Sequence, residues 1–338
     1  MENLLLIPLI IGFFVTFLVL PRWIKKAKKI GLVWEDMNKY NHPKNVAGSG
    51  GLIVILGFIL AVLFYIAIKI FYFKSNENIV EIFSLTTTIL LLAGIGIIDD
   101  LLGWQHGGLS KKFRVFLCFF AAIPLMVINA GYSRVGIPFI NGIDLGLIYP
   151  LVLIPLGIIA TSTGFNFLAG YSGLEAGQGI LILTGLSIVA YLTGSSWLAL
   201  IGLCMVASLI AFWIFNKYPA KVFPGDVLTY PIGGMIAIMA ILGNFEKIAI
   251  FFFIPYILEV ILKLRGKLIK QSFGKPNKDN SLEMPYNKIY GLEHLAIWFL
   301  KKIKKNGKVY ENDVVKFIHL FQLIIIILGF LIFRNFIF

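Results

Sequence analysis

The chain has 338 residues, of which 59% are hydrophobic and only 14% are charged, and its formal net charge is +13. Soluble domains carry about 25% charged residues, so this composition excludes an ordinary soluble domain and indicates an integral membrane protein. The two cysteines, Cys118 and Cys204, both lie inside apolar segments, and they provide neither a disulfide framework nor a zinc-binding spacing.

The apolar residues fall in blocks long enough to cross a bilayer, which takes about 20 residues of helix. We therefore expect an all-α integral membrane protein with about ten transmembrane helices, forming a single polytopic domain over residues 1–338. No basic residue precedes the first block, so we interpret that block as a membrane anchor and not as a signal peptide. The expected spans, in chain order, are 4–20, 49–72, 79–98, 113–130, 147–164, 178–195, 197–215, 229–243, 247–264 and 314–337.

The loops between these spans differ in charge. Alternate loops share one side of the membrane, and one set, together with Arg114, holds 23 of the 30 lysines and arginines, against five in the other set. Because cytoplasmic loops carry the excess of basic residues, we expect the basic set to be cytoplasmic and both termini to lie outside. The expected cytoplasmic loops are 21–48, 99–112, 165–177, 216–228 and 265–313.

The excess of basic residues in one set of loops also indicates what the protein contacts on that side. Anionic lipid headgroups account for a basic cytoplasmic rim, so we expect membrane lipid, and no nucleic acid, to face it. The expected location is the cell membrane, or the endoplasmic reticulum membrane in a eukaryote.

Unusual polar motifs gather in four of the expected cytoplasmic loops. The first loop contains "EDMNKYNHPKNVAGSGG" (35–51), and the second opens with the acid pair of "DDLLGW" (99–104). The third holds "GFNFLAGYSGLEAGQG" (164–179), and the fourth holds "KVFPGDVLTY" (221–230). Hydropathy and basic-residue counts thus place all four motifs on one side, which predicts a cytoplasmic active-site face.

The acidic residues of these motifs indicate a site for a hard divalent cation. Asp99, Asp100 and Asp226 offer carboxylate oxygens and Asn166 an amide oxygen, and such ligands suit Mg²⁺ or Mn²⁺ and not zinc. In proteins Mg²⁺ is usually held by one or two carboxylates together with substrate phosphates. The motifs therefore predict phosphoryl transfer.

Glycines and lysines in the same loops agree with that chemistry. The five glycines of 164–179 let backbone N–H groups approach a phosphate or a flat base, and Lys111 and Lys112 could offset phosphate charge.

Each motif also has a structural interpretation. The acid pair could solvate a helix end, Asp226 could be an N-cap, and the lysines could merely mark the cytoplasmic side. A helix C-terminus disfavours negative charge, however, which favours a functional acid pair.

Taken together, the motifs resemble the polyprenyl-phosphate N-acetylhexosamine-1-phosphate transferase family. Within it they resemble the archaeal and eukaryotic branch that uses UDP-N-acetylglucosamine (UDP-GlcNAc) and dolichyl phosphate. "NFLAGYSGLEAGQ" is similar to the branch signature N-x-LAG-x-NGLEAGQ, "FPGDVLTY" to F-x-GDT-x-x-Y, and "EDMNK" to DLNK. "DDLLGW" resembles the paired aspartates of the family, and "SLEMPYN" resembles its late KLEM-x-Y segment. The resemblance covers nearly the whole chain and is most specific at 166–178.

The resemblance implies an enzyme with ten transmembrane helices and a cytoplasmic site, which moves a sugar phosphate from a UDP-sugar to a lipid phosphate with Mg²⁺ and releases UMP. It implies that Asn166 and Asp226 hold the metal and that Phe223 packs on the uracil. The acid pair would orient or deprotonate the acceptor phosphate. Consecutive side chains point about 100° apart on a helix, and we expect Asp99 to face the site and Asp100 to support it. The implied catalytic residues are Asp99, Asp100 and Lys112, and the implied substrate-binding residues are Met37, Asn38, Lys111, Gly170, Ser172, Glu175, Phe223 and Lys275.

The sequence departs from the branch pattern at several positions. Ser172 stands where the signature has Asn, and residues 45–51 lack an acid that eukaryotic members carry. The arginine- and histidine-rich segment before "LEM", which contacts the sugar and pyrophosphate in the branch, is here "FGKPNKDN" (273–280). Lys275, Asn277 and Lys278 are the candidate substitutes, but the segment does not align with the branch pattern, so the donor sugar is less defined than the reaction.

We therefore expect a Mg²⁺-dependent transferase that takes UDP-GlcNAc or a related UDP-sugar and a dolichyl or other polyprenyl phosphate. Its product would be the first lipid-linked sugar of N-glycan or surface polysaccharide synthesis, and assembly into a homodimer is left open. A polytopic transporter is one alternative, which predicts acids within the spans. A lipid phosphotransferase that uses another nucleotide donor is a second alternative, although the sequence has no DG-x-x-AR pattern.

Overall fold

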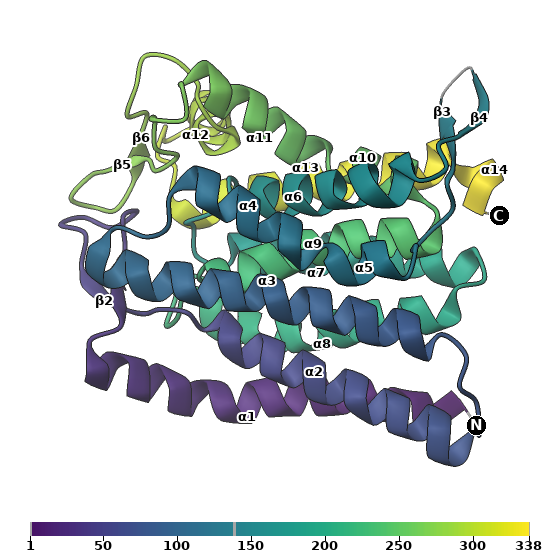
Figure 1. Ribbon diagram of the computed structural model, residues 1–338. Coiled ribbons are helices and arrows are strands. Elements are labelled where there is room, and N and C mark those ends of the chain that lie inside the picture. Colours follow the sequence, from purple (N-terminus) through teal and green to yellow (C-terminus); the bar gives the residue numbers. More distant parts are fainter. Residues whose placement is uncertain (1, 138–139, 338) are drawn as a thin grey trace.

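The computed structural model describes residues 2–137 and 140–337, and it shows a bundle of long helices with small two-stranded sheets at its ends (Figure 1). The long helices are α1 (Ile7–Ile30), α2 (Gly51–Ala67), α3 (Ile79–His106), α7 (Leu174–Leu192), α8 (Ser196–Asn216), α9 (Asp226–Gly243) and α13 (Glu311–Ile332). The shorter helical segments are η1 (Glu2–Leu6), η2 (Ile68–Tyr72), α4 (Lys111–Ala121), α5 (Ile123–Val127), η3 (Tyr149–Leu153), α6 (Ile154–Phe165), α10 (Glu246–Phe252), α11 (Ile254–Arg265), α12 (Leu292–Ile303) and α14 (Arg334–Ile337).

Three short antiparallel strand pairs complete the described chain. They are β1 (Val33–Glu35) with β2 (Lys44–Ala47), β3 (Arg134–Ile137) with β4 (Ile140–Asp144), and β5 (Lys275–Pro276) with β6 (Leu282–Glu283). The pairs β1–β2 and β5–β6 lie at one end of the bundle, whereas β3–β4 and both chain ends lie at the other (Figure 1).

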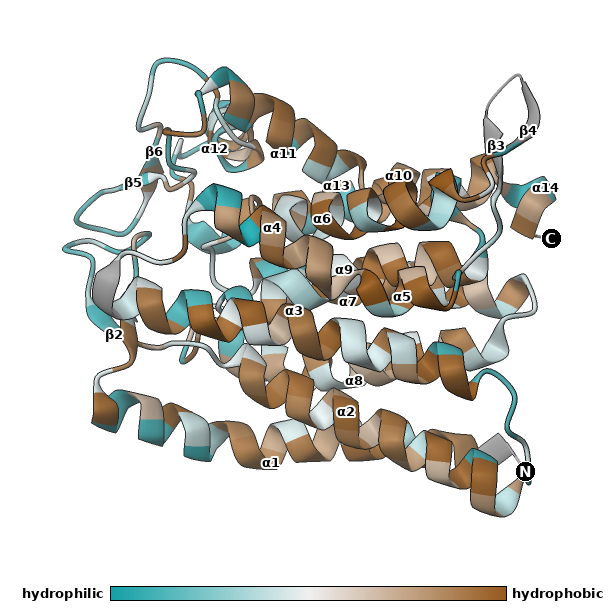
Figure 2. Ribbon diagram, viewed as in Figure 1, coloured by the Kyte–Doolittle hydropathy of each residue, from teal (hydrophilic) through white to brown (hydrophobic). Residues whose placement is uncertain are grey.

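Among the described residues, seven helical segments are long and apolar enough to cross a membrane. The prediction of a helical, multi-pass membrane protein is therefore confirmed. Figure 2 shows hydrophobic residues along the length of the bundle and hydrophilic residues gathered toward the end that carries β2, β5 and β6.

Several of the predicted spans are not single α-helices. The span 113–130 is divided into α4 and α5, 147–164 begins as the π-helical η3 before α6, and 247–264 is divided into α10 and α11. A proline occupies the first turn after each change. Proline has no N–H and its ring clashes with the preceding turn, so it begins a helix readily but interrupts one.

Several predicted loop boundaries were wrong, because the helices extend further than their apolar residues do. α1 continues through the basic residues to Ile30. α3 continues to His106, so Asp99 and Asp100 lie inside this helix, seven and six residues before its end, and not at the start of a loop. At the same end of the bundle, α7 begins at Leu174 and α9 begins at Asp226.

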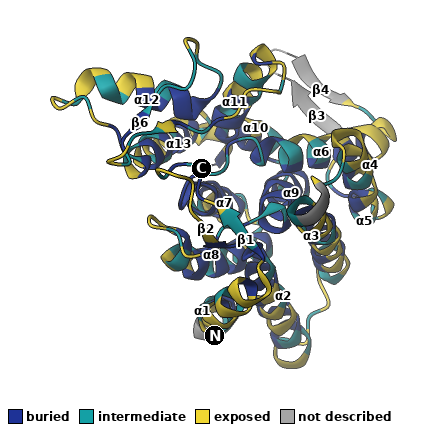
Figure 3. Ribbon diagram, turned by 90° about the vertical axis from the view of Figure 1, so that its left-hand side faces the viewer, coloured by how far each residue is buried: buried dark blue, intermediate teal, exposed yellow. Residues whose placement is uncertain are grey.

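Helices α7 and α9 form the centre of the bundle, as the buried colours of Figure 3 show. Small residues allow close helix packing in membrane proteins, and glycines serve that purpose around α9. A Cβ on Gly233 would clash with the backbone of α6 at Thr161, and a Cβ on Gly96 of α3 would clash with the backbone of Asp226. The contact at Gly96 brings the acid pair of α3 beside the first residue of α9.

Candidate active site

The site is built on the junction between α3 and the N-terminus of α9. Asp100 Oδ1 accepts a hydrogen bond from the backbone N–H of Asp226 at 2.8 Å, and its Oδ2 accepts one from Val227 at 3.4 Å. A carboxylate in this position satisfies free N–H groups and interacts favourably with the helix dipole. Gly225 precedes the helix with φ +73°, and a Cβ there would clash with the Asp100 carboxylate. The cap of α9 thus comes from Asp100, and the alternative that Asp226 caps its own helix was wrong.

Asp226 and Asn166, the two predicted metal ligands, lie side by side. Asn166 follows the last residue of α6, and its amide nitrogen donates to Asp226 Oδ1 at 3.0 Å. The Asp226 side chain remains 23% exposed, and both residues line a cavity. Carboxylate and amide oxygens on a cavity wall are a donor set that fits Mg²⁺.

Asp99 contacts a different set of groups from Asp100. Its Oδ1 accepts the backbone N–H of Leu109 at 2.6 Å, and its Oδ2 lies 3.0 Å from Nε of Arg114. Only Asp100 of the acid pair is among the residues that line the cavity. The structure therefore places Asp100 on the cavity wall and Asp99 behind it, the reverse of the expected arrangement.

Arg114 is the cation at this cluster, and the sequence analysis did not identify it as a site residue. Besides its contact with Asp99, its Nη1 lies 3.7 Å from Asp226 Oδ2 and 3.4 Å from the hydroxyl of Tyr230. Lys112, the expected phosphate-binding residue, is exposed instead. Lys111 is exposed as well, and its Nζ donates to the carbonyl of Leu268.

A signal for Arg114 was present in the sequence. Ser110 is the N-cap of α4, and its side chain accepts a hydrogen bond from the Phe113 N–H. Once the helix is known to begin at Lys111, Lys112 and Arg114 are about 200° apart around it, so only one of the two can face α3.

The polar cavity has a volume of about 590 Å³, within the usual range for small-molecule sites. Seven predicted residues line it, and Trp34, Trp104 and Phe273 are aromatic lining residues that the sequence analysis did not identify. The predicted residues on the wall are Met37, Asp100, Asn166, Gly170, Glu175, Phe223 and Asp226. The predicted residues that are not on the wall are Asn38, Asp99, Lys111, Lys112, Ser172 and Lys275.

The glycine-containing loop 166–173 is held at its backbone by side chains from three parts of the chain. Asn38 donates from Nδ2 to the carbonyl of Gly170 at 3.0 Å, and the N–H of Gly170 donates to Glu175 at 2.7 Å. The N–H of Ser172 donates to Glu311, at the start of α13, at 2.6 Å. Asn38 and Glu175 therefore fix the loop conformation, and the residue that holds Ser172 had not been predicted.

Glu311 also joins this loop to the first loop of the chain. Lys39 Nζ lies 2.6 Å from Glu311 and 3.3 Å from Asp36. Burial raises the pKa of Asp36, and the nearby Glu311 carboxylate adds to the rise. Burial acts to lower the pKa of Lys39, but its ion pairs outweigh that effect and raise it.

Phe273 forms the wall of the cavity that comes from the long loop after α11. Gly170 has φ +99°, and a Cβ there would lie 2.6 Å from the Phe273 ring, so glycine permits both the turn and the close ring contact. The Tyr171 hydroxyl anchors the neighbouring backbone, because it donates to the carbonyl of Ser272 and accepts from the N–H of Gly274. Lys275, the expected substitute for a sugar-binding arginine, is exposed on β5.

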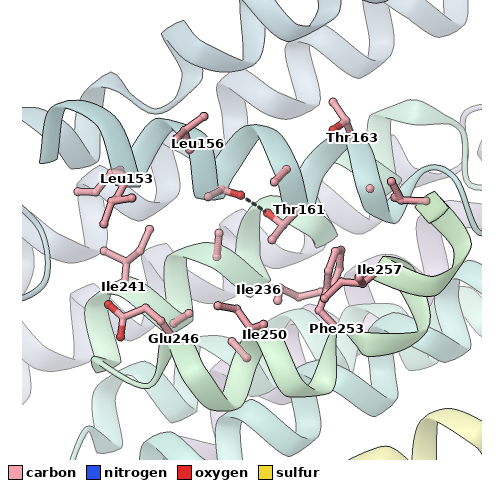
Figure 4. A pocket seen from close by; sticks show the side chains of 18 of the residues that line it. Leu153, Leu156, Thr161, Thr163, Ile236, Ile241, Glu246, Ile250, Phe253 and Ile257 are labelled. Carbon is pink, nitrogen blue, oxygen red and sulfur yellow. Dashed lines mark hydrogen bonds between the residues drawn. The ribbon is translucent and has the colours of Figure 1, made fainter. Parts of the chain in front are cut away.

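An apolar groove of about 660 Å³ lies between η3 and α6 on one side and α9, α10 and α11 on the other (Figure 4). Leu153, Leu156, Ile236 and Ile257 are among its apolar lining residues, and Glu246 is its one acidic lining residue among the described residues. The groove reaches Phe167, the residue that follows Asn166 on the wall of the polar cavity. An apolar groove and a polar, acidic cavity therefore adjoin at residues 166–167.

Comparisons with known proteins relate the chain to one family. The family model described as glycosyl transferase family 4 matches residues 82–244. A Saccharolobus solfataricus protein, provisionally named UDP-N-acetylglucosamine–dolichyl-phosphate N-acetylglucosaminephosphotransferase, is 35% identical over 92% of this chain and 91% of its own length. A Dictyostelium discoideum protein with the same enzyme name is 29% identical over 74% of this chain and 70% of its own length.

A bacterial relative extends the comparison. The phospho-N-acetylmuramoyl-pentapeptide-transferase of Halalkalibacterium halodurans is 30% identical over 80% of this chain and 86% of its own length. The family-model match includes the acid pair of α3, Asn166 and Asp226. The chain therefore belongs to glycosyl transferase family 4, the family of polyprenyl-phosphate hexosamine-1-phosphate transferases that its motifs resemble.

Proposed function

We propose that this protein transfers a sugar 1-phosphate from a UDP-sugar, UDP-GlcNAc in the first instance, to a dolichyl or other polyprenyl phosphate. The products are UMP and a lipid-pyrophosphate-linked sugar. The observation that carries the proposal is the polar cavity with Asp100, Asn166 and Asp226, which adjoins an apolar groove in a chain of this family. One compartment suits a nucleotide sugar and the other suits an isoprenoid chain.

The donor binds in the polar cavity. The rings of Phe223 and Phe273 and the backbone at Gly170 provide flat surfaces for the uracil, since stacking on an aromatic ring is worth about 1–3 kcal/mol per base. Trp34 and Trp104 line the same cavity and offer an apolar surface to the sugar ring. Lys44 lines it as well and can meet a phosphate of the donor.

The charges of the cluster favour a divalent cation. Asp99, Asp100 and Asp226 with Arg114 leave a formal charge of −2, from three carboxylates and one guanidinium. We propose that Asn166 and Asp226 hold Mg²⁺, or Mn²⁺, against the donor pyrophosphate. The bound ion would stabilise the negative charge that develops on the leaving UMP.

The reaction is an exchange at the β-phosphorus of the donor. An oxygen of the lipid phosphate forms a bond to that phosphorus, and the bond to the oxygen that bridges the two donor phosphorus atoms breaks, so UMP leaves with that oxygen. Asp100, on the cavity wall, orients the acceptor phosphate or removes its proton. Arg114 pairs with Asp99 and supplies positive charge near the phosphates.

The polyprenyl chain lies in the groove of Figure 4, with its phosphate toward residues 166–167. This placement needs the polar cavity at the membrane surface. We propose ten crossings, the seven long helices plus the three made of shorter segments, with the cavity on the cytoplasmic side. An even number of crossings agrees with the two chain ends lying at the same end of the bundle, opposite the cavity (Figure 1).

The test is a transfer assay with purified protein in lipid nanodiscs, polyprenyl phosphate, Mg²⁺ and a panel of radiolabelled UDP-sugars. We expect label from UDP-GlcNAc to enter the lipid fraction with release of one UMP per lipid product. If no UDP-sugar yields a labelled lipid while the protein is folded, the proposal is wrong. If another UDP-sugar is preferred, the donor assignment alone is wrong.

A further inference from the structure

Helix α12 has an orientation unlike that of the long helices. It lies at the end of the bundle that carries β5 and β6, is seen nearly end-on in Figure 1 and is seen along its length in Figure 3. The long helices run along Figure 1 and are seen end-on in Figure 3. α12 therefore runs across the bundle direction, which is parallel to the surface of a membrane that the bundle spans.

The two faces of α12 differ sharply. Leu292, Ala296 and Ile297 are buried against the protein, with at most 3% exposure. Trp298, Phe299 and Ile303 are exposed by 42%, 41% and 61%. The three residues form an exposed apolar stripe, in which the Phe299 ring also packs on Phe317 of α13 with 5.4 Å between the ring centres.

Five lysines lie on or beside this apolar stripe, and two of them form no ion pair among the described residues: Lys302 lies between Trp298 and Phe299 around the helix, and Lys305 follows the end of α12. Lys301 pairs with Glu283, Lys304 with Asp313 at 2.5 Å, and Lys308 with Asp279 at 2.7 Å. Lys302 and Lys305 are exposed and form no ion pair among the residues that the structure describes. The ammonium group of Lys302 lies over the Trp298 ring, 3.8 Å from its centre.

We propose that α12 lies in the surface of the cytoplasmic leaflet and binds anionic lipid headgroups through Lys302 and Lys305. Trp298, Phe299 and Ile303 enter the boundary between headgroups and acyl chains, and the two free ammonium groups contact lipid phosphates. A helix with an apolar face bordered by lysines is typical of such interfacial sites, and tryptophan is enriched at that depth. The inference rests on the proposed cytoplasmic placement of the polar cavity.

The contact has a direct structural link to the polar cavity. Ile297, on the buried face of α12, comes within 3.0 Å of the position that a Cβ on Gly274 would take. Gly274 follows Phe273, which lines the cavity. An anchored α12 therefore supports the segment that carries this aromatic wall.

The test measures lipid contact and needs no turnover, so its result is independent of the transfer assay. A fluorophore is attached at Ile303→Cys, and for comparison at Asn287→Cys in the same long loop; Cys118 and Cys204 are buried. The protein is placed in nanodiscs that contain phosphatidylcholine and either spin-labelled phosphatidylglycerol or spin-labelled phosphatidylcholine, with the label near the headgroup. Quenching by the two labelled lipids is then compared.

We expect stronger quenching at position 303 than at position 287, and several-fold stronger quenching there by the anionic than by the zwitterionic lipid. One lysine near an anionic surface contributes about a fivefold preference. The preference should be lost in Lys302→Gln/Lys305→Gln and retained in Lys278→Gln/Lys288→Gln, which removes the same charge from the same loop.

Three results would overturn the proposal. They are equal quenching at positions 303 and 287, equal quenching by the two lipids at position 303, and loss of the preference in the control variant as well. A thermal-unfolding measurement on each variant confirms that it is folded.

Discussion

Arg114→Gln should abolish most of the activity, whereas Lys112→Gln should leave it nearly intact. Arg114 lies 3.0 Å from Asp99 and 3.7 Å from Asp226. Removing one partner of a buried ion pair costs about 3–5 kcal/mol. The Arg114 side chain is 28% exposed, so solvent screening reduces the expected loss of stability to about 2 kcal/mol.

The catalytic effect should exceed the effect on folding. Losing one preorganised positive or hydrogen-bonding group at a developing charge costs about 10²–10³ in kcat, and we expect this range for Arg114→Gln. Arg114→Lys keeps the charge but loses the planar fork that reaches two carboxylates at once, so an intermediate loss of about tenfold is expected. Lys112, which is exposed, provides the matched control on the same helix.

The assay is initial-rate transfer from UDP-GlcNAc to polyprenyl phosphate, with each variant checked for folding by thermal unfolding. If Lys112→Gln loses as much kcat as Arg114→Gln, the assignment of the catalytic cation is wrong. The same conclusion follows if folded Arg114→Gln retains kcat within about twofold, because a donor at a developing charge is worth far more than that.

Four further predictions follow from the same geometry. Asp226→Asn should raise the Mg²⁺ concentration for half-maximal rate at least about tenfold; an unchanged Mg²⁺ titration contradicts the metal assignment. Glu311→Gln should raise the KM for UDP-sugar about tenfold with little change in kcat, since it loosens the backbone at Ser172; a pure kcat loss would exclude this positioning role. Gly157→Trp adds a side chain in open space within the groove and should raise only the KM for polyprenyl phosphate, so an equal rise for the donor would place the lipid elsewhere. Burial lowers the pKa of His294 to about 4, so the unfolded state binds more protons between pH 4 and 6.5, and stability should fall by up to about 3 kcal/mol as the pH is lowered through that window. Thermal unfolding from pH 7 to pH 4 should show a smaller fall in His294→Gln, and an equal fall in both proteins would contradict the assignment.

The sequence predicted the site residues well where several of them lie within one short motif. Asn166, Gly170, Phe223 and Asp226 were predicted from their motifs, and all four lie on one cavity wall. Their loops are short and connect rigid helices at one end of the bundle, so the topology leaves them little freedom to lie elsewhere.

The sequence predicted helix ends and site residues poorly where their positions depend on packing between segments far apart in the chain. The acid pair of α3 stays helical beyond the apolar segment, where Gly96 packs on α9 and Asp100 bonds the first N–H of that helix. Arg114 and Phe273 reach the site because α4 and the long loop pack back onto the bundle. Arg114 belongs to none of the motifs that identified the site, and Phe273 begins the 273–280 segment, in which only Lys275, Asn277 and Lys278 were considered as binding residues.

The residues that line the polar cavity come from two kinds of segment, the helices of the bundle and a peripheral loop. Asp100, Asn166 and Asp226 are attached to helices at the centre of the bundle, where a change in one would disturb several others. Phe273 is carried by a peripheral loop, which is joined to the bundle through the Tyr171 hydroxyl and through the contact of its ring with Gly170. Donor preference can therefore diversify by exchange of the 265–313 segment, while the phosphate chemistry is inherited unchanged. A chimera that carries this segment from a relative with another donor is the natural means of transplanting sugar specificity within the family.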